Sequence, residues 1–167
     1  MSQRSGTVQT VQGSIEPARL GITLTQEHLL LDLRLPQPRG DGGAEITREI
    51  SGRNRRHTME NPNNLLLSDV ALAVSELGEF KAAGGGAIVE ATSIGLLRDP
   101  EGLREISAAT GVHVVMGCSY YYQPYHPEQV AGLSVEDITA EIVRDITEGA
   151  GGSGVRAGII GEVGLGW

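Results

Sequence analysis

Short apolar segments alternate with helical segments along most of this 167-residue chain. Near-continuous apolar runs at residues 22–31, 87–92, 112–118 and 155–163 are predicted as strands. A half-exposed strand would alternate polar and apolar residues, so continuous runs indicate parallel strands that are covered on both faces. Helical periodicity of the apolar residues lies between the later runs, at residues 68–83, 99–111 and 134–146.

The helix ends are marked by residues suited to cap them. Asp99 and Pro100 predict a helix start, because Asp99 can accept free backbone N–H groups and Pro100 lacks one. Gly111 predicts the end of that helix, and Ser134 with Asp137 resembles a capping box. Strands linked by helices predict a parallel sheet, which is either doubly wound or part of a (β/α) barrel.

The charge balance excludes two classes of partner. The chain has 13 Lys and Arg against 21 Asp and Glu, a formal net charge of −8. Nucleic acids and anionic membranes reward clustered positive charge, so neither is expected as a partner. No apolar run approaches the roughly 20 residues of a spanning helix, and no signal segment opens the sequence. With one cysteine, Cys118, which is interpreted as a small buried residue, the predicted location is cytoplasmic.

Polar residues stand at the predicted carboxyl ends of the strands, where parallel α/β folds bind ligands. Gln26 and His28 are two residues apart and would share a face, and Glu162 ends the last run. Imidazole and carboxylate together favour a metal site, since both suit zinc. The alternative is that His28 is a hydrogen-bonded core histidine and Glu162 caps a following helix. Tyr121 and its neighbouring tyrosines follow the third run and would line a substrate pocket or pack within a loop.

Several segments, taken together and in order, are similar to those of a known enzyme family. They are residues 21–29 (GITLTQEHL), 89–92 (VEAT), 98–103 (RDPEGL), 114–117 (VVMG), 125–127 (YHP) and 154–164 (GVRAGIIGEVG). This set resembles the phosphotriesterase-related branch of the amidohydrolase superfamily. The resemblance implies a (β/α)8 TIM barrel of which residues 1–167 form the N-terminal half, with the first four βα units, a short hairpin around residues 7–15 and no second domain.

The resemblance also implies an activity and a cofactor. The expected function is zinc-dependent hydrolysis of phosphotriester, lactone or related ester bonds, with a small-molecule ester as substrate and two metal ions in a complete site. His28 corresponds to the second histidine of the family's His-x-His motif, and Glu162 to the bridging carboxylate. No catalytic residue is implied beyond the hydroxide that the metals hold.

Two departures from the family pattern bear on activity. Gln26 takes the place of the first histidine, and an amide oxygen is a poorer zinc ligand than imidazole. The family's remaining ligands come from later strands, and the sequence stops at Trp167. The alternative prediction is therefore a non-catalytic half barrel or a structural partner. Open sheet edges on such a half barrel predict self-association.

Overall fold

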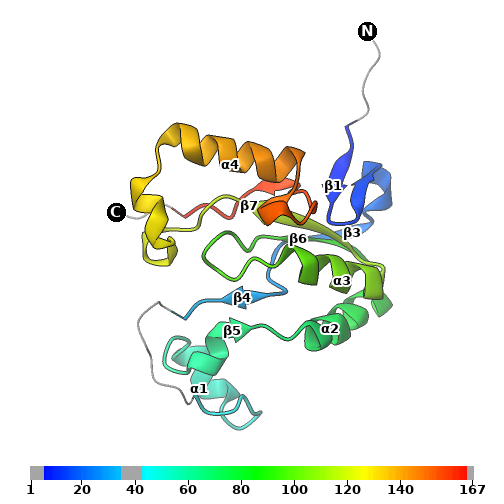
Figure 1. Cartoon of the computed structure of the whole chain (residues 1–167). Helices are drawn as coiled ribbons and strands as arrows, with labels where there is room; N and C mark the ends of the chain where they lie inside the picture. The colour runs from blue at the N-terminus through cyan, green and yellow to red at the C-terminus, as the bar shows by residue number, and fades with distance from the viewer. Residues whose placement is uncertain (1–5, 35–42, 165–167) are drawn as a thin grey trace.

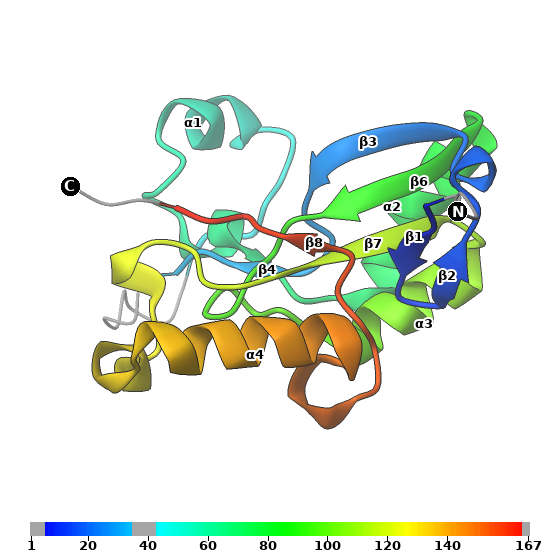
Figure 2. The same ribbon diagram turned by 90° about the horizontal axis from the view of Figure 1, so that it is seen from above.

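The structure is a computed structural model that describes residues 6–34 and 43–164. Its centre is a parallel sheet with the strand order β3-β6-β7-β8 in the described part of the chain. The strands are β3 (Ile22–Glu27), β6 (Gly85–Glu90), β7 (His113–Cys118) and β8 (Ile159–Ile160). Figure 2 shows β3 and β6 running in the same direction, so their carboxyl ends share one edge of the sheet. The predicted order of parallel strands is confirmed.

The three longer helices cover the same side of the sheet. They are α2 (Val70–Ala82), α3 (Pro100–Thr110) and α4 (Val135–Thr147). Helix α2 packs on β6, while α3 and α4 pack on β7, and Figure 1 shows α2 and α3 side by side. Within the described residues no helix lies on the other face, so this is the curled sheet of a half barrel and not a doubly wound sheet.

The helix ends agree with the sequence. Asp69 and Asp99 cap α2 and α3 by accepting backbone N–H groups, and Pro100 takes the first position of α3. Gly111 ends α3 with a φ of 67°, a left-handed conformation that glycine adopts without a steric cost. Ser134 and Asp137 form the predicted capping box at the start of α4.

The hydrophobic core lies between the helices and the sheet. Ile88 of β6 and the alternate residues Val114, Met116 and Cys118 of β7 are buried against the helices. Their partners are Ala73 and Leu77 of α2, Leu103 and Ile106 of α3, and Ile142 and Ile146 of α4. The helical stripes predicted from the sequence therefore face the sheet, except that Val135 at the start of α4, predicted to be buried, is 76% exposed.

Smaller elements close the ends of the sheet. A hairpin of β1 (Val8–Thr10) and β2 (Gly13–Ile15), expected from the resemblance, joins β7 through the Val11 N–H and the Val114 carbonyl at 2.9 Å. In the long connection after β3, β4 (Leu31–Asp32) pairs with β5 (Leu66–Leu67) near α1 (Ser51–Arg56). Short 3-10 helices span Pro17–Arg19, Pro62–Leu65, Gln123–Tyr125, Glu128–Gly132 and Ala150–Gly152.

Two strands are shorter than the apolar runs predicted. The run at residues 22–31 ends as β3 at Glu27, and its last residue belongs to β4. The run at 155–163 pairs only over Ile159–Ile160, because Gly158 and Gly161 flank a strand that has one partner among the described residues. No helix in the described part of the chain has the length and apolarity needed to span a membrane.

Candidate active site

A pocket of about 490 Å³ lies at the carboxyl ends of the outer strands. Gln26 of β3, Tyr121 after β7 and Glu162 after β8 line it with small and apolar residues of the same strand ends. The strand ends position Glu162, whose backbone N–H donates to the carbonyl of Ala91 at 3.0 Å. Residues from separate parts of the sequence therefore meet where parallel α/β folds bind ligands.

A hydrogen bond joins two of the predicted site residues. The side-chain amide of Gln26 donates to Glu162 Oε2 at 2.6 Å. Burial, together with the charge and the hydrogen bond of Glu162, raises the pKa of Tyr121. The tyrosine thus contacts the same carboxylate, which supports the pocket interpretation for Tyr121 over loop packing alone. Glu162 thus accepts a hydrogen bond from the Gln26 amide and lies close to the Tyr121 phenol.

His28 lies in a different pocket, of about 230 Å³, together with Leu66, Leu72 and Asp69. Its Nδ1 is 3.0 Å from the hydroxyl of Thr92. Strand β3 ends at Glu27 after a register shift, so the alternation of side chains that would place Gln26 and His28 on one face does not extend to His28. The structure brings Gln26 and Glu162 together and places His28 apart from them.

A buried carboxyl group that the sequence analysis did not single out lies behind His28. Glu90 ends β6 and is fully buried. Burial raises its pKa to about 7, against the opposing effect of hydrogen bonds from Thr92 and from the Leu29 backbone. The available signal was a charged residue inside the apolar run at 87–92, since an ionisable residue is rarely buried without a specific partner.

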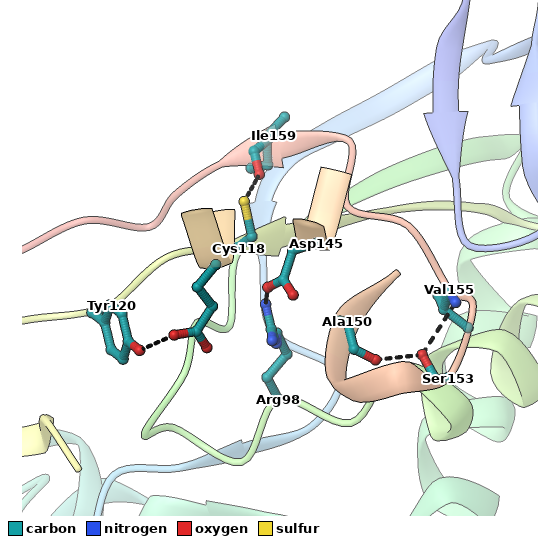
Figure 3. A network of polar contacts seen from close by, with 9 residues as sticks. Arg98, Cys118, Tyr120, Asp145, Ala150, Ser153, Val155 and Ile159 are labelled. Carbon is teal, nitrogen blue, oxygen red and sulfur yellow. Dashed lines mark hydrogen bonds and ion pairs between the residues drawn. The ribbon is translucent and has the colours of Figure 1, made fainter. Parts of the chain in front are cut away.

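A second polar network, shown in Figure 3, holds α4 to the sheet and to the loop after β6. Arg98 pairs with Asp145 at 2.6 Å, and the Tyr120 hydroxyl donates to Glu141 at the same distance. Cys118 donates its thiol to the Ile159 carbonyl, and burial raises its pKa to about 11. These contacts indicate structural roles, and the thiol lacks the lowered pKa of a nucleophile.

A zinc ion takes about four ligands, or three and a water. The pocket supplies the Glu162 carboxylate and the Gln26 amide oxygen. Over the described ranges, no group of three or more His, Cys, Asp or Glu side chains is close enough to hold a metal. The residues therefore fit one part of a metal site, and further ligands are needed to complete it.

Comparison with known proteins relates the whole chain to one family of sequences. The Phosphotriesterase family profile matches residues 6–167. An N-acetyltaurine hydrolase from Tetraodon nigroviridis is 41% identical over 100% of this chain and 50% of its own length. The chain thus spans about half the length of the curated relatives it matches.

The chain also matches about half the length of related proteins whose structures are solved. A resiniferatoxin-binding protein from Rhodobacter sphaeroides aligns with a TM-score of 0.89 and 43% identity, over 96% of this chain and 47% of that one. A variant of a PTE-like lactonase from Deinococcus radiodurans aligns with a TM-score of 0.65 and 29% identity, over 92% of this chain and 44% of that one. With the profile match across nearly all of its residues, the chain belongs to the phosphotriesterase family.

Proposed function

We propose that this chain forms the N-terminal half of a metal-dependent hydrolase barrel that cleaves carboxylic ester, lactone or amide bonds or phosphotriesters. The observation that carries the proposal is the pocket in which Gln26 bonds Glu162 beside Tyr121, at the carboxyl ends of the strands. The family match supports a hydrolase, and the relatives named above include an amide hydrolase and a lactonase.

The polar residues of the pocket have distinct roles in this proposal. Glu162 supplies the negative charge of the site, and Gln26 orients its carboxylate through the 2.6 Å hydrogen bond. Tyr121, whose pKa is raised by burial and by Glu162, keeps its proton and serves as a hydrogen-bond donor. A phenol donates one hydrogen, so once it turns from Glu162 to the substrate this group would stabilise charge that develops on the oxygen of the bond being cleaved.

Zinc, which the resemblance implies, is part of the same proposal. Glu162 and Gln26 would supply oxygen ligands, with the others coming from the portion of the barrel that the relatives have beyond this chain. His28, the expected nitrogen ligand, lies in a separate pocket and would join them only by moving toward Glu162. When bound, zinc would act as a Lewis acid toward the carbonyl or phosphoryl group.

The test uses the full-length gene product that carries this sequence. N-acetyltaurine, a lactone and a phosphotriester are offered to the wild type, to Glu162→Gln and to Glu105→Gln, which changes an exposed residue of α3. We expect hydrolysis of at least one substrate, a loss on the order of 100-fold or more in Glu162→Gln, and no loss in the control. Absence of hydrolysis by the metal-loaded wild type, or full activity of Glu162→Gln, would contradict the proposal.

A non-catalytic half barrel is the second candidate, and the incomplete donor set favours it. In that case the protein would fold without binding zinc, and the same assay would show no turnover. Zinc content of the purified protein separates the two, because only the hydrolase is expected to bind zinc in a fixed ratio to the chain.

A further inference from the structure

Three polar groups surround the hydroxyl of Thr92 at the end of β6. Its Oγ1 lies 2.9 Å from the Leu30 carbonyl oxygen, 3.0 Å from His28 Nδ1 and within hydrogen-bond distance of Glu90 Oε1. Thr92 and Leu30 are almost completely buried, and Glu90 is entirely so. Buried polar groups are costly unless they are paired, so these contacts must be assigned consistently.

The number of hydrogens on the hydroxyl limits the assignment. A threonine hydroxyl donates one hydrogen and accepts through two lone pairs, whereas a carbonyl oxygen only accepts. If Thr92 donates to Leu30, both His28 and Glu90 must donate to Thr92. If Thr92 donates to an ionised Glu90 instead, His28 must still donate to Thr92. If Thr92 donated to Nδ1 or to an ionised Glu90, the Leu30 carbonyl would lose its donor. Only the first arrangement satisfies all three partners, and in it the hydrogen of the neutral imidazole is on Nδ1.

Glu90 completes the network and holds the hydroxyl in place. Its Oε2 accepts the Thr92 N–H at 3.2 Å, and its Oε1 accepts the Leu29 N–H at 3.3 Å. The ion pairs among the described residues include none to Glu90. A raised pKa agrees with the arrangement that satisfies every partner, in which the neutral acid donates to Thr92 and Thr92 donates to Leu30.

We propose that Thr92 and Glu90 are positioning residues that hold His28 in the Nδ1–H tautomer and leave the lone pair of Nε2 for a ligand or a proton. Backbone or carboxylate partners commonly fix a ligand histidine in this way, and here a hydroxyl with a carboxyl group behind it does so. Only the use to which Nε2 is put rests on the proposed function. The tautomer itself is a property of the metal-free protein.

Nitrogen-15 NMR of the metal-free, full-length protein labelled at histidine tests the proposal at neutral pH, with His28→Gln used to assign the signals. We expect wild-type His28 to show one dominant tautomer, protonated at Nδ1. Thr92→Val, which removes the hydroxyl and keeps the shape, should give a mixture of tautomers, and Thr92→Ser should restore the wild-type signal. Thr139→Val on the exposed side of α4 is the control and should change nothing.

Two results would overturn the inference. One is a wild-type His28 that carries its hydrogen on Nε2, which needs no variant to fold. The other is a folded Thr92→Val protein with the wild-type tautomer. The protonation of Glu90 is measured separately by infrared spectroscopy at mildly acidic pH. A neutral carboxylic acid gives a carbonyl band, which Glu90→Gln should remove. Its absence from the wild type would exclude the role of Glu90 as donor. Because none of these readouts involves hydrolysis or zinc, failure of the proposed function leaves them interpretable.

Discussion

The side-chain amide of Gln26 is hydrogen-bonded to Glu162 at 2.6 Å, although 136 positions separate the two residues in sequence. The pair joins the ends of β3 and β8, which are the outer strands of the sheet. Neighbouring strands lie about 4.8 Å apart, so a flat sheet of this order would separate its outer strands by about 14 Å. The pair meets because the sheet curls, as it does in a barrel, and because the chain after β8 crosses toward β6, where the Glu162 N–H bonds the Ala91 carbonyl.

Replacing Gln26 by histidine should strengthen metal binding. Imidazole is a better zinc ligand than an amide oxygen, so Gln26→His in the full-length protein should raise zinc affinity on the order of tenfold or more, with a parallel gain in activity. Competition with a chelator, followed by measurement of bound metal, gives the affinity. Gln12→His on the hairpin is the matched control, because Gln12 bonds the Arg104 carbonyl away from the pocket. Equal zinc content in the wild type, Gln26→His and Gln12→His would show that residue 26 is not a metal ligand.

The buried ion pair between Arg98 and Asp145 should be costly to break. The two side chains are 9% and 3% exposed, so removing one partner leaves a buried charge unpaired. Arg98→Met should lower the free energy of unfolding by about 3–5 kcal/mol, and the double variant with Asp145→Leu should recover much of that loss. Urea denaturation measures both. Arg53→Ala, which breaks an exposed pair with Glu60, should cost at most about 1 kcal/mol. A loss no larger for Arg98→Met than for Arg53→Ala would show that the buried pair does not stabilise the fold.

Glu90 should make the fold less stable as the pH rises. Its pKa is about 7 in the folded protein and 4.5 in the reference state, so the folded protein holds the proton more tightly. The resulting stabilisation is fully present below pH 4.5 and is lost as the pH rises through 7, a total of about 3 kcal/mol.

Glu90→Gln is neutral at every pH, so its stability relative to the wild type should increase between pH 5 and pH 8 by an amount of that order. Urea denaturation of both proteins at each pH makes the comparison. If the free energy of unfolding changed with pH by the same amount in both proteins, Glu90 would not hold its proton in the folded state.

The sheet edges should promote association of the 167-residue chain when it is produced alone. Ile22 and Leu24 of β3 and Ile160 of β8 are exposed, and the outer strands have unpaired backbone groups along their free edges in the described structure. Light scattering after size-exclusion chromatography should show dimers or larger species. Charged residues protect strand edges, so Ile22→Lys combined with Ile160→Lys should shift the population toward monomer. A wild-type chain that elutes as a folded monomer would contradict this prediction.

The order of strands and helices could be predicted from the sequence because it depends on local patterns. Apolar periodicity located α2, α3 and α4, and the caps Asp99 and Ser134 marked where two of them begin. The ends of β3 and β8 could not be predicted in the same way, since an apolar run continues past the point where hydrogen bonding to a neighbouring strand stops.

For the candidate site, too, the sequence predicted some features and only the tertiary structure decided others. The sequence by itself determined that the chain belongs with phosphotriesterase-like barrels and that Gln26, His28 and Glu162 stand near strand ends. The tertiary structure alone decided that Gln26 meets Glu162, that His28 turns toward Thr92, and that Glu90 is buried behind it. Strand alternation fixes the direction of a side chain only while the strand continues, and the side-chain hydrogen bond of His28 forms with Thr92, 64 positions away. Which partner such a side chain finds depends on the packing of distant segments, and local sequence does not encode that packing.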